Sequence, residues 1–567
     1  MPNSASRAHT LAARRELQFA CVFILLAGAF SAPAQVLRGR PEMQPGKGVI
    51  QGTVVDGVTR EPLKKAQVML AGMLSGPPTA ITDSAGHFLF RDLPAGGYWL
   101  TATKDGYHPP RSPADVDSNV QVTLTSDEEK RTIEIALAPS GSITGKVLDE
   151  DGLPVRGCSV MAVSPVWEQG KQTLRGVAGG NGTDDKGEYR IHNLARGRYY
   201  VFARCHIELA AAHPLLPRGD PRTPHDTYLP QFYGGGLDPT TATRLNVPPG
   251  TNLEGIDFEM HRTPAFTLRG AINSSDPELL AGHLSILLIP QHPLMRNLID
   301  MGAGANPQER TFQIRSVIPG SYMLVAFTAE NGRSSFARKA IEIGSAPPDP
   351  VVISLAPSSD LSGSVQFDSE EHQSPENAQI MLTPVEQTMY IPQPRGEIGK
   401  DGTFTITGVL PGRWRLTLNG FGYVKAMTLG GQQVSPHDFQ IPSGGAGPLR
   451  ITLGSKMGEV DVSISGSKPE GQISALLYPE NVDQVGTGLE RVAAGTERLS
   501  FFGVAPGKYR LLVTDMPNPW PVLQRPDLLK SLESHTQAAD VTEGGKLSVT
   551  AEIVSRDELK KELEDKE

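Results

Sequence analysis

The chain has 567 residues, of which 60 are glycine and 47 are proline, while 6% are aromatic. Its formal net charge of -9 at pH 7 argues against a nucleic-acid-binding protein, which would carry an excess of positive charge. No sustained apolar run follows the N-terminal region, so the sequence predicts no transmembrane domain beyond that region. This composition is typical of an exported β protein.

Residues 1–34 are predicted to be a signal peptide. Three arginines precede the apolar stretch 17–30, and the small residues 32–34 fit a cleavage site. Retention as an anchor is the alternative, although the run is shorter than the roughly 20 residues of a spanning helix. Cleavage removes three Arg and one Glu and changes the formal charge from -9 to -11. The expected location is therefore secreted, periplasmic or at the cell surface.

One hairpin pattern recurs five times along the chain. In each copy an apolar or aromatic residue is followed ten positions later by an aromatic residue, which stands two positions after a glycine. The pairs are Phe88 and Tyr98, Tyr189 and Tyr199, Phe312 and Tyr322, Phe404 and Trp414, and Leu499 and Tyr509. Alternating apolar positions place one face of both strands in a core, and the glycine permits the turn between them. Such a period indicates an array of one domain type with buried hairpin aromatics.

Each unit also opens with a glycine-containing strand, and most units close with two short strands. About seven short strands per roughly hundred residues are typical of a β-sandwich. We therefore predict an all-β chain, a tandem array of about five transthyretin-like or immunoglobulin-like β-sandwich domains after the signal peptide. Helical periodicity is confined to 526–533 and to a charged tail. The expected domains are 47–139, 140–263, 264–357, 358–455 and 456–555, followed by the tail 556–567.

A family resemblance is carried by the first two units. The first reads GTVVDGVTREPLKKAQVML and then TDSAGHFLFRDLPAGGYWLTATKDGY; the second reads GKVLDEDGLPVRGCSVMAV and then TDDKGEYRIHNLARGRYYVFAR. Both resemble the carboxypeptidase regulatory-like domain, a transthyretin-like sandwich. The chain as a whole is similar to large bacterial secreted proteins built from several such domains. The third and fifth units lack the Asp-x-x-Gly turn and match by the hairpin alone. The resemblance implies a fold and no catalytic residues.

Two cysteines remain after export, and both lie in the second unit. Cys158 falls on its predicted second strand, and Cys205 follows the strand that carries Tyr199. Two thiols on elements of one sandwich are expected to pair in an oxidising compartment. The alternative is two buried, inert thiols.

The long insertion 207–238 is the predicted binding surface. It is rich in Pro and Gly and carries Tyr228, Phe232 and Tyr233 without strand alternation. Long loops in compact domains are usually functional or disordered, and exposed aromatics stack on sugar rings. By analogy with carbohydrate-binding sandwiches, these residues and Trp167 are the candidate ligand-binding set. The alternative is that the rings cover a sandwich edge or pack between units one and two.

Catalytic motifs were not found. None of the 13 histidines has Glu three residues later, as a zinc carboxypeptidase would need, and no nucleophile elbow, H-E-x-x-H, P-loop or dinucleotide fingerprint occurs. The acidic turn 149–152 lacks the later ligands of a calcium loop. The other candidate metal group is His206, Glu208, His213 and His225, for which a solvated loop is the favoured interpretation. We expect no enzyme activity, metal or cofactor.

The sequence thus predicts a non-enzymatic secreted or cell-envelope binding or scaffold protein, with carbohydrate or envelope proteins as partners. One alternative is an enzyme with an unrecognised site, which a cleft of ionisable groups with perturbed pKa values would reveal. The other is an accessory component of an outer-membrane transport system, to which this chain would contribute a soluble extension.

Overall fold

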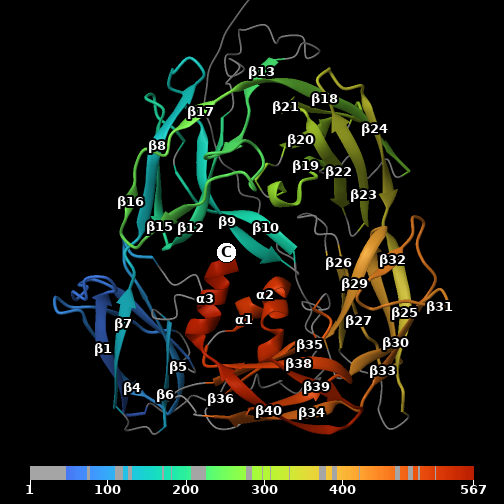
Figure 1. Cartoon of the computed structure of the whole chain (residues 1–567). Coiled ribbons are helices and arrows are strands. Elements are labelled where there is room, and N and C mark those ends of the chain that lie inside the picture. The colour runs from blue at the N-terminus through green and yellow to red at the C-terminus, as the bar shows by residue number, and fades with distance from the viewer. Residues whose placement is uncertain are drawn as a thin grey trace, which may run out of the picture.

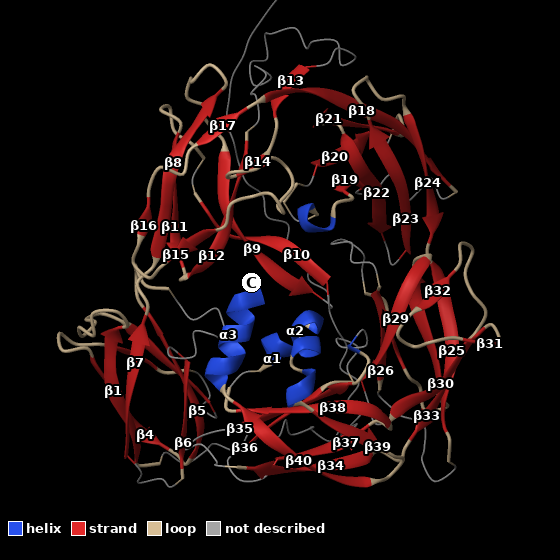
Figure 2. Cartoon of the chain, viewed as in Figure 1, coloured by secondary structure: helices blue, strands red, loops and turns tan. Residues whose placement is uncertain are grey.

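The structure, a computed structural model, describes residues 46–566 with internal gaps. The gaps are residues 73–76, 109–118, 126–129, 169–170, 181, 206–224, 276–283, 297, 300, 307, 331–332, 370–377, 386–392, 420–421, 467–472, 483–488, 496–498 and 517–518. The predicted signal peptide lies outside the described residues. Five β-rich units follow one another around a ring, with the C-terminal helices near its centre (Figure 1). Strands make up most of the regular structure (Figure 2), so the predicted all-β class is confirmed.

The first unit is a two-layer sandwich. Its strands are β1 (Gly48–Asp56), β2 (Gln67–Gly72), β3 (Thr79–Ile81), β4 (His87–Leu93), β5 (Gly96–Thr103), β6 (Asn119–Leu124) and β7 (Lys130–Leu137). The sheets β4-β1-β7 and β3-β2-β5-β6 enclose a core that includes Phe88, Phe90 and Tyr98. Its first and last strands, β1 and β7, pair in parallel.

The second unit repeats this plan. Its strands are β8 (Gly141–Asp149), β9 (Ser159–Glu168), β10 (Lys171–Gly179), β11 (Glu188–Leu194), β12 (Gly197–Arg204), β14 (Gln231–Phe232), β15 (Leu245–Val247), β16 (Asn252–Leu253) and β17 (Phe258–Met260). One sheet has the order β10-β9-β12-β14, and the other has the order β11-β8-β16. The long β9–β10 hairpin extends toward the middle of the ring (Figure 1).

In the third unit the two layers are joined at both edges. Its elements are β13 (His225–Tyr228), β18 (Arg262–Ser274), β19 (Leu284–Pro290), η3 (Pro293–Met295), β20 (Met301–Asn306), β21 (Thr311–Val317), β22 (Gly320–Glu330), β23 (Arg333–Ile343) and β24 (Val351–Pro357). β20 pairs with both β19 and β21, and β24 pairs with both β18 and β23. β18 runs without interruption across the predicted boundary between 263 and 264, and β13 from the insertion pairs with its beginning.

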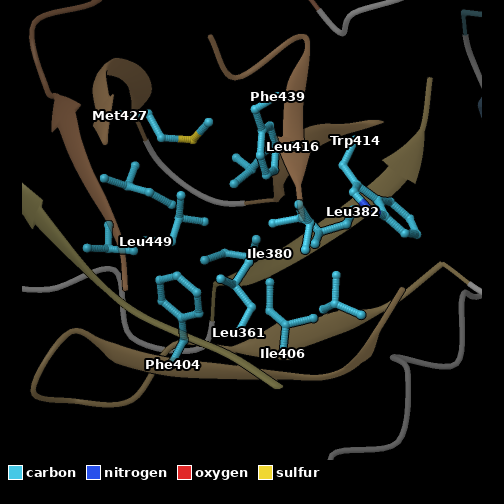
Figure 3. Packing of buried hydrophobic residues seen from close by; sticks show 14 of the residues in the cluster. Leu361, Ile380, Leu382, Phe404, Ile406, Trp414, Leu416, Met427, Phe439 and Leu449 are labelled. Carbon is cyan, nitrogen blue, oxygen red and sulfur yellow. The ribbon is translucent and has the colours of Figure 1, made fainter. Parts of the chain in front are cut away.

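The fourth unit is again a sandwich of two sheets, β28-β25-β33-β30-β31 and β27-β26-β29-β32. The strands are β25 (Ser359–Phe367), β26 (Gln379–Pro384), β27 (Arg395–Glu397), β28 (Thr403–Val409), β29 (Gly412–Asn419), β30 (Tyr423–Leu429), β31 (Gln432–Gln433), β32 (Phe439–Ile441) and β33 (Leu449–Gly454). Its core, centred on Ile380, Leu382 and Trp414, is shown in Figure 3. Val325 and Phe336 of the third unit belong to the same apolar cluster.

The fifth unit adds helices to the sandwich. It contains β34 (Gly458–Ser465), β35 (Ile473–Pro479), β36 (Arg491–Gly495), β37 (Leu499–Val504), β38 (Gly507–Thr514), α1 (Trp520–Leu523), α2 (Pro526–Ser531), η5 (Glu533–His535), β39 (Gln537–Val541), β40 (Lys546–Val554) and α3 (Arg556–Lys566). β35 is buried along its whole length: Ile473 and Ala475 face the sandwich core, whereas Leu476 and Tyr478 pack with Leu528 of α2 and Leu559 of α3. The helices predicted in this region therefore cover the outer face of the sheet.

All five hairpins close with the same hydrogen bond. In each unit the aromatic side chain donates to the backbone carbonyl four residues earlier in the turn. The bonds run from Tyr98 to Pro94 (2.6 Å), Tyr199 to Ala195 (2.8 Å), Tyr322 to Ile318 (3.0 Å), Trp414 to Leu410 (2.9 Å) and Tyr509 to Ala505 (2.9 Å). The intervening glycine has a φ between 153° and 159° in every copy, which other residues rarely adopt. All five rings are buried, as the sequence predicts.

The opening strand of a unit requires glycine for a steric reason. A Cβ on Gly52 would lie 2.0 Å from the carbonyl oxygen of Ile133 on the neighbouring parallel strand, and a Cβ on Gly363 would lie 2.2 Å from that of Leu449. Such distances are closer than any side chain permits, so glycine lets the first strand approach the last.

Candidate functional site

The aromatic residues of the insertion are buried, not exposed. Residues 206–224 lie outside the described part of the chain, but β13 and β14 follow them. Phe232 is 1% exposed, and its ring centroid lies 4.9 Å from that of Phe202 on β12. Both rings join Leu298 and Ile299 of the third unit in one apolar cluster. Phe232 therefore packs at the seam between the second and third units.

Tyr228 and Tyr233 do not form an open platform either. Tyr228 is 8% exposed and belongs to the core of the second unit. Tyr233 is half-buried, with its ring 5.9 Å from that of Phe258. The alternative of inward-turned rings is the one that the structure shows, because β13 pairs with β18 and β14 pairs with β12. The seam that Phe232 joins lies between the second and third units, not between the first and second.

Trp167 lies on β9, where that strand reaches toward the C-terminal helices. It is half-buried, and the guanidinium carbon of Arg525 lies 5.6 Å from its ring centroid. Such a distance is that of a cation–π contact. Trp167 therefore serves as a contact between the second and fifth units, which the sequence did not indicate.

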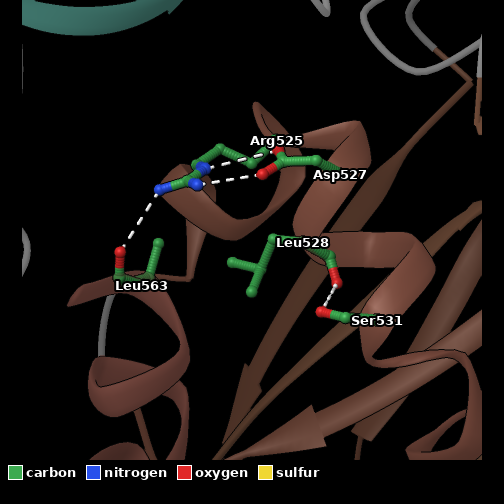
Figure 4. A network of polar contacts seen from close by, with 5 residues as sticks. All are labelled: Arg525, Asp527, Leu528, Ser531 and Leu563. Atoms are coloured by element: carbon green, nitrogen blue, oxygen red, sulfur yellow. Dashed lines mark hydrogen bonds and ion pairs between the residues drawn. The ribbon is translucent and has the colours of Figure 1, made fainter. Parts of the chain in front are cut away.

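Arg525 precedes α2 and is 5% exposed. Its Nη2 donates to Asp527 Oδ2 at 2.9 Å, and its Nη1 donates to the carbonyl oxygen of Leu563 in α3 at 3.4 Å (Figure 4). One guanidinium thus holds two C-terminal helices together and also meets Trp167. A buried charge is tolerated only where such partners satisfy it.

The fourth and fifth units meet through a small polar cluster. Lys425 Nζ lies 2.8 Å from Asp368 Oδ2 and 2.7 Å from Glu543 Oε1, and the Tyr423 hydroxyl donates to the same Glu543 oxygen at 3.0 Å. Hydrogen bonding to Lys425 lowers the pKa of both carboxyl groups below their usual values. Only the folded chain brings these residues together, since Lys425 and Glu543 are far apart in sequence.

The two cysteines of the second unit are joined. A disulfide links Cys158 at the start of β9 to Cys205 after β12, and both residues are buried. The covalent link therefore ties together two neighbouring strands of one sheet.

Within the described residues, no group of three or more His, Cys, Asp or Glu side chains is placed to hold a metal ion. His206, Glu208 and His213 lie outside those residues, and the His225 side chain is not described. Asp149 Oδ1 accepts from the N–H groups of Asp151 and Leu153, which is the plain turn that the sequence favours. Before β11, the equivalent turn is closed by Asp184 Oδ1, which accepts from the N–H groups of Lys186 and Glu188. In the described part of the chain, no helix has the length and apolarity to cross a membrane.

Residues 49–137 match the family model of the carboxypeptidase regulatory-like domain. The first unit is therefore similar to that domain. This match confirms the resemblance for the first unit and agrees with the sandwich of β1–β7.

Other similarities are more distant. Colossin-A of Dictyostelium discoideum is 26% identical over 253 residues, which cover 43% of this chain but span only 2% of the relative's length. The minor pilin GBS52 of Streptococcus agalactiae shows 14% identity over 38% of this chain and 97% of its own, with a TM-score of 0.22. BcpA, the major pilin subunit of Bacillus cereus, shows 9% identity over 72% of this chain and 98% of its own, with a TM-score of 0.14. At these values the pilin similarities add no argument about function.

Proposed function

We propose that this protein is an exported, non-enzymatic scaffold of the cell envelope, whose β-sandwich units are held in a fixed ring and present their outer surfaces to partner proteins. The regulatory-like domain and the repeated sandwich hairpins support a structural role. The predicted signal peptide supports export.

The observation that carries the proposal is the contact between Arg525 and Trp167. Successive units already meet: Phe232 packs against the third unit, Phe336 packs into the fourth, and Lys425 reaches the fifth. Contacts between successive units alone are also compatible with a flexible array of domains. The contact of Arg525 with Trp167 joins the fifth unit to the second, so the second to fifth units form a closed loop. A closed loop favours a fixed arrangement of these units.

Small-angle scattering of the mature protein tests this proposal. The wild type is expected to fit the ring, and Arg525→Ala should increase the maximum dimension because it removes the link to Trp167 and the bond to α3. Arg156→Ala, on an exposed turn of the second unit, is the control for loss of one positive charge. A wild-type profile of an extended string, or equal profiles for wild type and Arg525→Ala, would contradict a ring held by this contact.

Export is tested separately. Fusion of residues 1–45 to alkaline phosphatase should give activity in an oxidising compartment outside the cytoplasm, and a cytoplasmic, inactive fusion would contradict export.

A further inference from the structure

The first unit exposes large apolar side chains on one face of a sheet. Trp99 on β5 is 50% exposed, Met69 on β2 is 40% exposed and Ile81 on β3 is 71% exposed. Trp99 is paired with Ala71, and Met69 stands two residues from Ala71 on the same strand. Side chains alternate along a strand, so all three lie opposite the core of the unit. We call this solvent face of β2, β3 and β5 the β2–β5 face.

The β2–β5 face carries no charged residue at its outward positions. These positions are Gln67, Met69 and Ala71 on β2, Thr79 and Ile81 on β3, and Gly97, Trp99, Thr101 and Thr103 on β5. The other sheet of the same unit differs, because Arg91 and Glu134 are exposed on it. An uncharged face with several large apolar side chains is typical of a docking surface.

The same face exists in other units in the same register. In each unit, the first and third residues after the hairpin aromatic pair with the neighbouring strand and point away from the core. In the first unit these residues are Trp99 and Thr101. The equivalent pairs are Tyr200 with Val163 and Phe202 with Met161 in the second unit, Met323 with Ile289 and Val325 with Leu287 in the third, and Arg510 with Tyr478 and Leu512 with Leu476 in the fifth. The faces can therefore be compared position by position.

In the second unit this face is covered by a helical turn of the third unit. Val163 and Phe202 are fully buried and share an apolar cluster with Met295, Leu298 and Ile299. The N–H groups of Leu298 and Ile299 both donate to the carbonyl oxygen of Met295, at 3.1 and 3.3 Å. The covering residues therefore form a turn of helix with an apolar side.

In the fifth unit the equivalent face lies under helices. Leu476 and Leu512 pack with Leu528 of α2 and Leu559 of α3. The face of the third unit packs against the fourth unit instead, through Val325. Two of these three covered faces thus bind an apolar helical segment, which indicates what kind of structure the surface accommodates.

The first unit keeps an apolar face without such a cover. Its strand β5 lies on the side of the unit that is turned toward the ring (Figure 1), yet the exposure of Trp99, Met69 and Ile81 shows that no other described part of the chain covers them. The fourth unit is different, because Arg415 stands where the first unit has Trp99. A second copy of the chain is a poor occupant, since its own β2–β5 face is also turned toward its ring and the two rings would obstruct each other.

We propose that the β2–β5 face binds an amphipathic helical segment of a partner protein, whose Leu, Ile or Met side chains pack on Trp99, Met69 and Ile81. The proposal rests on the proposed scaffold role, for which it names the kind of segment that is held. Because burial of an unpaired charge is costly, the side of the helix that meets this face carries no charge. Binding of this kind depends on apolar contact and changes little with ionic strength.

Fluorescence anisotropy with a labelled helical peptide tests the proposal on the mature protein. The peptide has about 18 residues, with Leu at i, i+3, i+4 and i+7 positions and Glu–Lys pairs on the opposite side. Its control has the same composition in an order that distributes Leu around the helix. The first peptide should bind, equally well at low and high salt, and the reordered peptide should bind about tenfold or more weakly.

The variant Trp99→Glu should weaken binding of the first peptide by about tenfold or more, because it places an unpaired charge at the contact. Phe502→Glu is the matched control, since Phe502 is an aromatic residue that is 70% exposed on β37 of the fifth unit. Trp99→Leu should keep the affinity within about threefold, because an apolar contact does not need an aromatic ring. Stacking on a sugar does need the ring.

Absence of peptide binding, equal binding of the reordered peptide, or equal loss in Phe502→Glu would overturn the proposal. It would also be overturned if the wild type were retained on a polysaccharide and Trp99→Leu were not, which would indicate a sugar platform. The two peptides give an answer even if a variant fails to fold. A ring in the scattering experiment without peptide binding would contradict this proposal alone, and peptide binding by an extended string would contradict the ring alone.

Discussion

Replacement of Trp414 tests how strongly the hairpin aromatic stabilises the fold of its unit. Trp414 is 1% exposed, and its Nε1–H satisfies the carbonyl of Leu410 at 2.9 Å. Trp414→Ala loses a large buried ring and leaves that carbonyl unpaired, so we expect a loss of about 5 kcal/mol in the free energy of unfolding. Trp414→Phe keeps a ring and loses the donor, for which about 2 kcal/mol is expected. Trp99→Ala, half exposed on β5, should cost less than about 1 kcal/mol.

Native-state hydrogen exchange with mass spectrometry measures these losses unit by unit. Faster exchange is expected in β28 and β29, and to a smaller degree in β22 and β23, because Val325 and Phe336 pack in the same cluster as Trp414. The first unit should exchange as in the wild type. Equal acceleration in all units, or none in the fourth, would refute the view that each hairpin stabilises its own core.

Two further predictions concern the covalent and ionic links. Reduction of Cys158–Cys205, which closes a separation of 47 residues, should cost about 4 kcal/mol, and non-reducing peptide mapping should show the bond; two alkylatable thiols in exported protein would contradict it. The lowered pKa values of Asp368 and Glu543 mean that their ion pairs stabilise the fold above the usual carboxyl range, and this contribution is lost as the pH falls through the lowered values. The protection factors of the β30 amides, corrected for the intrinsic exchange rate at each pH, should therefore fall below about pH 4, and unchanged protection factors would refute this dependence.

The sequence predicted the all-β fold because the hairpin is a local signal. The glycine, the turn and the aromatic lie within fifteen residues, and the bond that joins Tyr98 to Pro94 spans four. The junctions could not be predicted in this way. Arg525 and Trp167 are separated by more than three hundred residues, and nothing in either local pattern identifies its partner. The same holds for Lys425 and Glu543.

The burial of the aromatic residues in the insertion could not be predicted from the sequence. A Pro- and Gly-rich stretch without alternation predicts a loop, whereas β13 and β14 are two short strands whose partners, β18 and β12, lie elsewhere in the chain. A strand of two to four residues leaves too little periodicity to detect, yet pairing still buries Phe232.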